Sequence, residues 1–261
     1  MKVKVAKTAG FCYGVDRAVH LAESEAEKGG EMFTLGPIIH NPFVVADLEK
    51  KGVRILASAL DAPTGARVVI RSHGISKAEI DVLKQKNCEI LDATCPFVKK
   101  IHNTVENYAE KGYNIVVVGD KAHPEVQGIL GWCEHATVIN EPEQVKSDLF
   151  SGKKNCVVSQ TTFERKKWEE IKKKILKITS TCDIIDTICS ATALRQEETA
   201  ALSAECDAVI VVGGKESSNT KRLAHVAMKN CDSVFLVENA DELQAVDFGK
   251  FNQKHAVTVF H

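Results

Sequence analysis

Short apolar runs rich in valine and isoleucine alternate along this chain with longer stretches in which apolar residues recur every three to four positions. The runs lack the alternation of a half-exposed strand, as is typical of parallel strands buried on both faces. Strands alternating with amphipathic helices predict βαβ units and an α/β fold with parallel sheets. The predicted strands are residues 3–8, 32–35, 53–56, 89–93, 114–118, 136–139, 183–187, 208–212 and 233–237, and the predicted helices are residues 15–28, 42–51, 97–111, 124–133, 191–205 and 219–229.

This pattern occurs three times. Cys12, Cys95 and Cys189 each stand between an apolar run and an amphipathic stretch. A glycine follows each cysteine by 24 residues, and a polar residue follows by 28 residues; the glycines are Gly36, Gly119 and Gly213, and the polar residues are His40, His123 and Ser217. The same two spacings, cysteine to glycine and cysteine to polar residue, recur in three segments of the chain. They predict three pseudo-equivalent α/β modules, which we place at residues 1–94, 95–187 and 188–261.

The topology predicts where the loops of each module lie. Right-handed crossovers put the loops that follow strand carboxyl ends on one edge of a sheet, where α/β proteins bind ligands. Each cysteine is therefore expected on the same edge as the glycine loop of its module. A third loop is predicted after a strand in each module, within residues 67–74 of the first and residues 155–162 of the second. Its equivalent in the third module is expected after Ala256–Val259, just before the sequence ends at His261.

Composition narrows the classes of function. A formal net charge of −1 over 261 residues gives no overall basic field, so no nucleic-acid or membrane partner is expected. The basic run Lys172–Lys174 is interpreted as the solvated face of a helix. No segment approaches the ~20 apolar residues of a membrane span, and the first residues lack a signal-peptide core, so a cytoplasmic protein is expected.

Nine cysteines in a reducing compartment favour metal binding, catalysis or core packing over disulfides. Three thiolates that meet can hold zinc, or a cubane cluster with one iron left open, and the absence of any Cys-x-x-Cys pair excludes zinc ribbons and ferredoxin-type runs. The repeat singles out Cys12, Cys95 and Cys189 as ligands. The other cysteines are interpreted as packed side chains: Cys88, Cys133, Cys156, Cys182, Cys206 and Cys231.

Polar residues of the predicted loops indicate an anion site. They offer hydrogen-bond donors on loops that open helices, which suits a diphosphate; they are His40, His73, His123, Ser217, Ser218 and Asn219. The run Ser217–Asn219 also fits a simple helix cap. Glu125 is a candidate proton donor near a metal, although a first-turn carboxylate also stabilises a helix.

Seven motifs resemble one enzyme family in order and near its spacing. They run from residue 9 to residue 220 and read AGFCYGV, GPIIHNP, RSHGIS, DATCPFV, HPEV, SQTT and GGKESSNT. Together they resemble the 4-hydroxy-3-methylbut-2-enyl diphosphate reductases, the terminal enzymes of the non-mevalonate isoprenoid pathway.

The resemblance implies three modules arranged as a trefoil around a 4Fe–4S cluster held by Cys12, Cys95 and Cys189. It implies diphosphate binding by the six histidine, serine and asparagine residues, proton relay by Glu125, and positioning of the substrate hydroxyl or a water by Thr161. The implied reaction removes an allylic hydroxyl with two electrons and two protons, giving isopentenyl and dimethylallyl diphosphate. Reduced ferredoxin or flavodoxin is the implied electron donor.

The sequence departs from the family pattern at its C-terminal end, and two other functions are compatible with the same cysteines. The family continues past the last strand with a small-residue loop whose serine helps to bind diphosphate, whereas this sequence ends at His261, so a truncated third module is expected. A hydro-lyase would use the same cysteines without net reduction. A sensor or inactive remnant holding zinc or a cluster would catalyse nothing.

Overall fold

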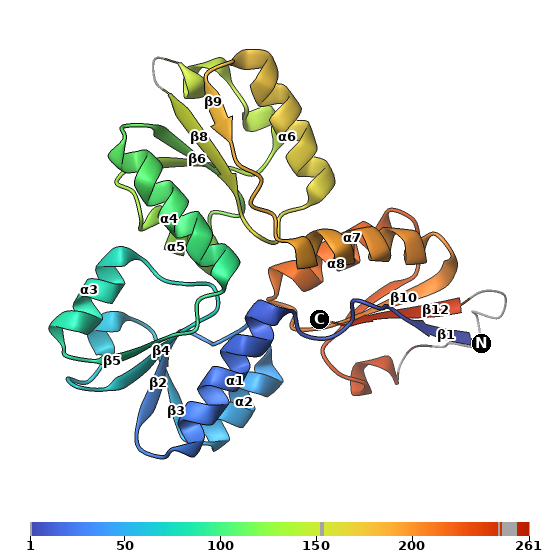
Figure 1. The fold of residues 1–261 in the computed structure, drawn as a ribbon. Helices are drawn as coiled ribbons and strands as arrows, with labels where there is room; N and C mark the ends of the chain where they lie inside the picture. The colour runs from blue at the N-terminus through green and yellow to red at the C-terminus, as the bar shows by residue number, and fades with distance from the viewer. Residues whose placement is uncertain (1, 152–153, 245, 247–254, 261) are drawn as a thin grey trace. The chain divides into compact units, whose positions relative to one another are not determined.

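The computed structural model describes residues 2–151, 154–244, 246 and 255–260. The chain forms two compact units. One comprises Met1–Cys12, His40–Pro42 and Cys189–His261, and the other comprises Tyr13–Ile39 and Phe43–Ile188. Each unit is built on parallel sheets with helices packed against them (Figure 1), so the predicted α/β class with parallel sheets is confirmed.

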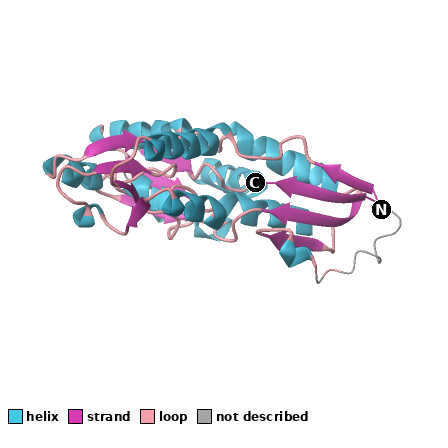
Figure 2. Ribbon diagram, turned by 90° about the horizontal axis from the view of Figure 1, so that it is seen from below, coloured by secondary structure: helices cyan, strands magenta, loops and turns pink. Residues whose placement is uncertain are grey.

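The first unit contains one sheet of four parallel strands in the order β1-β12-β10-β11. Figure 2 shows its strands side by side in magenta near the N-terminal marker. Helices α7 and α8 pack their apolar side chains against β10. The elements are β1 (Lys2–Val5), α7 (Ser190–Ser203), β10 (Cys206–Val212), α8 (Ser218–Met228), β11 (Val234–Val237), a short 3-10 helix (Asp241–Leu243) and β12 (His255–Phe260).

The second unit contains two sheets of four parallel strands, in the orders β3-β2-β4-β5 and β7-β6-β8-β9. The elements of the first sheet are α1 (Tyr13–Glu27), β2 (Met32–Leu35), α2 (Pro42–Lys50), β3 (Val53–Leu56), β4 (Arg67–Ile70), α3 (Lys77–Gln85) and β5 (Glu89–Asp92). Those of the second are α4 (Pro96–Glu110), β6 (Asn114–Val118), α5 (Pro124–Leu130), β7 (Ala136–Ile139), β8 (Asn155–Ser159), α6 (Arg165–Ile178) and β9 (Cys182–Ile184). Short 3-10 helices span Ala59–Asp61, Pro142–Gln144 and Ser147–Phe150.

Both sheets of the second unit are covered on their two faces, which explains the unbroken apolar runs. Residues of α1 and α2 pack on one face of the first sheet and residues of α3 on the other. In the second sheet, α4 and α5 pack on one face, and Trp168 of α6 packs with its neighbours on the other. The central strands β6 and β8 are accordingly buried along almost their whole length.

The strand order is the same in all three sheets, and this supports the threefold repeat. Read from β11, the first unit's sheet has the order β11-β10-β12-β1, so β1 occupies the place that β5 and β9 take in the other two sheets. These three strands lead into Cys12, Cys95 and Cys189 respectively. The sequence grouped residues 3–8 with the first module, whereas β1 pairs with β12. The module boundaries at 94 and 187 stay a prediction.

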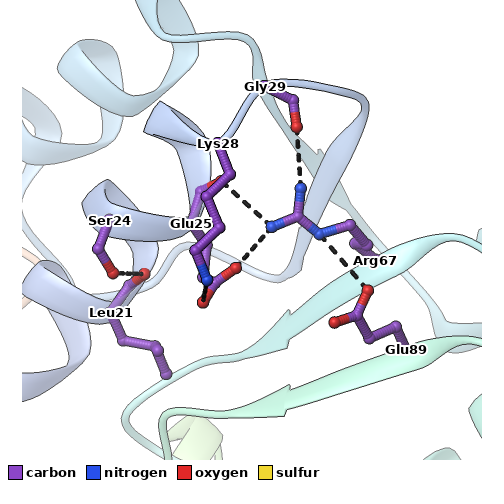
Figure 3. A network of polar contacts seen from close by, with 7 residues as sticks. All are labelled: Leu21, Ser24, Glu25, Lys28, Gly29, Arg67 and Glu89. Carbon is purple, nitrogen blue, oxygen red and sulfur yellow. Dashed lines mark hydrogen bonds and ion pairs between the residues drawn. The ribbon is translucent and has the colours of Figure 1, made fainter.

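An arginine clamp fixes the end of α1 against the first sheet of the second unit (Figure 3). Arg67 donates to the carbonyl oxygens of Gly29, at 2.9 Å, and Glu25, at 3.2 Å. It also pairs with the Glu25 carboxylate at 2.6 Å, and Lys28 contacts the same carboxylate at 2.6 Å. These contacts hold the turn that leads from α1 into β2.

Among the described residues, no helix is both long enough and apolar enough to cross a membrane.

Candidate functional site

A buried carboxylate and a threonine form a tight polar pair at the carboxyl ends of β6 and β8. Glu125 lies in the first turn of α5, after β6, and Thr161 follows β8. The Thr161 backbone N–H donates to Glu125 Oε1 at 2.6 Å, and the Thr161 hydroxyl contacts Oε2 at 2.7 Å. Parallel strands in register bring the two loops together, because Val118 of β6 pairs with Ser159 of β8.

Burial gives this carboxylate a proton affinity suited to acid–base chemistry. Glu125 is only 2% exposed. Burial raises the pKa of Glu125 to about 7 from an ordinary value of 4.5, against the opposing effect of the two Thr161 hydrogen bonds. A carboxyl group with a pKa near neutrality can both hold and release a proton under physiological conditions.

The loops that carry His73 and His123 are fastened to each other. The two imidazole rings meet edge to face with centroids 5.4 Å apart. Trp132 Nε1 donates to the Ile75 carbonyl at 3.0 Å, which ties the loop after β4 to the end of α5. A Cβ on Gly131 would lie 2.1 Å from the Ser76 Cβ, so a glycine is required for this close approach.

His123 presents a defined donor. It caps α5, and its Nδ1 accepts from the Glu125 backbone N–H at 3.1 Å. A neutral imidazole whose Nδ1 accepts carries its proton on Nε2. The Nε2–H is therefore the group that can donate to an anion, and the helix amino terminus adds partial positive charge beside it.

Cys95 lies in the same unit as these histidines and is tied to their loop. Its backbone N–H donates to the carbonyl of Ser72, the neighbour of His73, at 2.9 Å. Cys95 occupies the residue before α4. A Cβ on Gly14 would lie 2.4 Å from the Cys95 Sγ, so the glycine in the first turn of α1 leaves the space that this sulfur occupies.

Cys12 and Cys189 belong to the other unit. Cys189 caps α7, and its Sγ accepts from the Thr192 backbone N–H at 3.3 Å and lies 3.0 Å from the Thr192 hydroxyl. Cys12 immediately precedes α1. All three predicted ligands therefore stand at helix amino termini.

The unit that holds Cys12 and Cys189 also gathers the remaining predicted diphosphate residues. A Cβ on Gly214 would lie 2.0 Å from the His40 carbonyl oxygen, so the loop after β10 packs directly on the His40 backbone. Ser217 caps α8 and accepts from the Thr220 backbone N–H at 3.3 Å. Asn219 is 4% exposed, and neither its Nδ2 nor its Oδ1 has a hydrogen-bond partner among the described residues. A buried amide without partners is the signature expected of a polar ligand site.

The cysteines interpreted as packing residues divide by burial. Cys156, Cys206 and Cys231 are buried, which confirms their core role, whereas Cys88, Cys133 and Cys182 are half-buried. Burial raises the pKa of Cys156 to about 12, so this thiol stays protonated. The sequence patterns did not single out Gly14, nor two arginines, Arg17 and Arg195, that hold the loops before Cys95 and Cys12.

These features define a class of protein: an α/β protein of repeated parallel sheets with cysteines at helix amino termini and a buried acid at a sheet edge. The sequence matches the family model described as LytB protein over residues 3–260. The chain belongs to the LytB protein family, and the resemblance inferred from the seven motifs is confirmed.

Two curated relatives carry the same name. A 4-hydroxy-3-methylbut-2-enyl diphosphate reductase of Caldanaerobacter subterraneus subsp. tengcongensis is 48% identical over 248 residues, covering 93% of this chain and 86% of the relative. The protein of that name from Clostridioides difficile is 42% identical over 254 residues, covering 96% of this chain and 91% of the relative.

Two solved structures share the fold. The E-1-hydroxy-2-methyl-but-2-enyl-4-diphosphate reductase of Plasmodium falciparum matches with a TM-score of 0.90 at 28% identity, covering 99% of this chain and 82% of that chain. A structure of (E)-4-hydroxy-3-methyl-but-2-enyl diphosphate reductase, the terminal enzyme of the non-mevalonate pathway, matches with a TM-score of 0.70 at 37% identity, covering 100% of this chain and 93% of that chain. The prediction of an oxidoreductase is confirmed, and the family implies an iron–sulfur protein.

Proposed function

We propose that this chain converts (E)-4-hydroxy-3-methylbut-2-enyl diphosphate to isopentenyl diphosphate and dimethylallyl diphosphate. Two electrons and two protons enter, the allylic C–O bond breaks, and the hydroxyl leaves as water. The names of relatives that are 42–48% identical support the substrate. The buried Glu125–Thr161 pair is the structural observation that most directly supports the chemistry, because the departing oxygen needs a proton donor.

Cys12, Cys95 and Cys189 are proposed as the ligands of one 4Fe–4S cluster. Their surroundings suit thiolate ligands: a helix amino terminus at each, N–H donation from Thr192 to the Cys189 sulfur, and the space left by Gly14 beside the Cys95 sulfur. When bound, such a cluster supplies electrons one at a time and a Lewis-acidic iron for the hydroxyl oxygen.

The diphosphate is proposed to bind to His40, His73, His123, Ser217, Ser218 and Asn219. Nε2–H of His123 and the amide of Asn219 are donors suited to phosphate oxygens, and the amino termini of α5 and α8 favour negative charge. Anchoring the diphosphate fixes the position of the allylic carbon and its hydroxyl, which lowers the entropic part of the barrier.

Glu125 is proposed to deliver the proton to the departing hydroxyl, and Thr161 is proposed to orient the Glu125 carboxyl group. When Glu125 is ionised, the Thr161 hydroxyl donates to Oε2. When Glu125 is protonated, the same hydroxyl can accept from the carboxyl O–H and pass its own proton onward. The burial that raises the pKa of Glu125 to about 7 keeps a large share of the acid form near neutral pH.

We propose a cytoplasmic location, because thiolate ligands need a reducing compartment. Reduced ferredoxin or flavodoxin is the proposed electron donor, since two electrons must come from outside the chain and these proteins carry them singly.

The test uses protein prepared without air and incubated with the allylic diphosphate, dithionite and a viologen mediator. We expect both products by mass spectrometry, and no conversion when the reductant is left out. Conversion without reductant would instead establish a hydro-lyase, and a colourless zinc protein without turnover would establish a non-enzymatic role. Iron and sulfide analysis of the same preparation decides whether the proposed cluster is present.

Matched variants test the role of the acid. Glu125→Gln keeps the shape and the Thr161 contacts but cannot release a proton, so kcat should fall by roughly 100-fold or more. Glu106→Gln serves as the control, because Glu106 forms a surface ion pair with Lys77 at 2.5 Å. Equal rates for the two variants would remove Glu125 from the mechanism.

A further inference from the structure

Two arginines hold backbone carbonyls just before two of the proposed cluster ligands. Arg17 lies in the second turn of α1, the helix that begins directly after Cys12. Its Nη1 donates to the Thr94 carbonyl at 3.2 Å and its Nη2 to the Asp92 carbonyl at 3.0 Å. Thr94 is the residue immediately before Cys95. One guanidinium therefore fixes the peptide that leads from β5 to Cys95.

Arg195 forms the same kind of contact in the other unit. It lies in α7, the helix that Cys189 caps, and is 5% exposed. Its Nε donates to the Thr8 carbonyl at 3.1 Å and its Nη2 to the Gly10 carbonyl at 2.5 Å. Thr8 and Gly10 belong to the segment between β1 and Cys12. This second guanidinium therefore fixes the peptide that leads to Cys12.

A carboxylate one turn further along α7 reinforces the second contact. Glu198 accepts from the backbone N–H groups of Lys7, at 2.7 Å, and Thr8, at 2.9 Å, and from the Thr8 hydroxyl at 2.6 Å. Arg195 thus binds backbone carbonyl groups, and Glu198 binds backbone N–H groups, of the segment between β1 and Cys12. That segment has no regular secondary structure between β1 and α1, apart from turns, so these side chains define its path.

We propose that Arg17 and Arg195 are positioning residues for the iron–sulfur cluster. Each ties the peptide before one cysteine ligand to the helix that begins at another, so the ligands keep their places before the metal arrives. This inference rests on the proposed function, which makes these cysteines ligands.

The physical reason lies in the planar fork of the guanidinium. Carbonyl groups beyond the end of a strand have no ladder partner, and a mobile peptide there would have to be ordered when the cluster binds. A guanidinium places two donors in fixed directions and is always charged, so its bonds to carbonyls are stronger than neutral ones. Each arginine thereby reduces the ordering cost of metal binding and slows the opening of the ligand loop.

The test compares Arg17→Met and Arg195→Met with Arg67→Met. Arg67 is a matched control, because it also donates to two backbone carbonyls, as Figure 3 shows, but the turn it holds carries no proposed ligand. Each variant is prepared without air. Iron and sulfide are measured, the loss of cluster absorbance to an iron chelator is timed, and the metal-free protein is unfolded in urea.

We expect Arg17→Met and Arg195→Met to lose iron to the chelator at least about tenfold faster than the unsubstituted protein, because each variant loses two charge-assisted hydrogen bonds to backbone carbonyls. Arg67→Met should lose iron at a rate within about twofold of that of the unsubstituted protein. This should hold even if its urea unfolding midpoint falls as much as the midpoints of Arg17→Met and Arg195→Met. Arg17 is half-buried, so its replacement disturbs the fold less than replacement of the buried Arg195. The Arg17 variant therefore still provides the test if the Arg195 variant does not fold.

Two results would overturn the inference. One is iron retention by the Arg17 and Arg195 variants equal to that of the unsubstituted protein. The other is iron loss that follows the loss of stability equally in all three variants, which would make these contacts merely structural. If the unsubstituted protein holds no iron and sulfide, the proposed function fails and this inference fails with it. If the unsubstituted protein holds iron and sulfide but the arginine variants behave as above, only this inference fails.

Discussion

The buried acid Glu125 should leave a mark on stability that is separate from catalysis. The folded protein holds the Glu125 proton up to a pKa of about 7, whereas the unfolded chain releases it near the ordinary value of 4.5. This group therefore stabilises the fold fully below about pH 4.5, and its contribution is lost as the pH rises through about 7. The interval between 4.5 and about 7 corresponds to about 3 kcal/mol, at about 1.4 kcal/mol for each pH unit.

Glu125→Gln removes this titration while keeping the local contacts. A glutamine amide is neutral, like the protonated acid, and it can accept from the Thr161 backbone N–H and donate to the Thr161 hydroxyl. We expect the variant to be as stable as the unsubstituted protein near pH 4.5 and about 3 kcal/mol more stable at pH 8. The same change that removes the proposed proton donor should therefore stabilise the protein at alkaline pH.

Urea unfolding of the metal-free proteins at pH 5, 6, 7 and 8 measures this difference. Metal-free protein is used so that cluster binding does not add its own pH dependence. A stability difference between Glu125→Gln and the unsubstituted protein that stays constant from pH 5 to pH 8 would refute the reasoning, because it would mean that Glu125 titrates equally in the folded and unfolded states.

Three further predictions concern the ligands and the anion site. Substituting serine for any one of the proposed ligands, Cys12, Cys95 and Cys189, should sharply lower the iron content of protein prepared without air. Cys156→Ser in the buried core should not lower it, and equal iron in all variants would exclude the assignment. Gly14→Ala places a Cβ 2.4 Å from the Cys95 sulfur and should speed loss of cluster absorbance in air, whereas Gly128→Ala, with its nearest neighbour at 3.5 Å, should not, and matching rates would contradict the steric argument. Asn219→Ala should weaken inorganic diphosphate binding by roughly tenfold in calorimetric titration, and unchanged binding would remove Asn219 from the site.

The sequence predicted the repeated elements closely where the chain itself carries a strong local signal. The strands at 32–35, 53–56, 114–118 and 136–139 coincide with the residues found, because each is a short run of mainly apolar residues between turns. The expectation that each cysteine shares a sheet edge with the glycine loop 24 residues later is wrong. The strands before the cysteines are β1, β5 and β9, whereas the strands before the glycine loops are β2, β6 and β10, and each of these belongs to a different sheet from the strand before its cysteine.

Strand pairing across the chain was beyond the sequence. Residues 2–5 read as part of the first module, yet they pair with β12, more than 250 residues away. The pattern of apolar residues in a strand predicts which of its faces are buried, but it does not predict which strand pairs with it. The pairing of β1 with β12 therefore depends on the tertiary structure. The equivalence of β1 with β5 and β9 became visible only in the strand orders of the sheets.

The candidate site divides in the same way. The sequence by itself determined which residues are candidates for the chemistry, because cysteines at repeated positions and polar residues in helix-opening loops have a local physical meaning. Only the tertiary structure decided what surrounds them: the burial that shifts the pKa of Glu125, the glycine that makes room for the Cys95 sulfur, and the arginines that hold the ligand loops. Burial and long-range hydrogen bonds depend on groups that are distant in the chain, and no spacing pattern along the sequence records them.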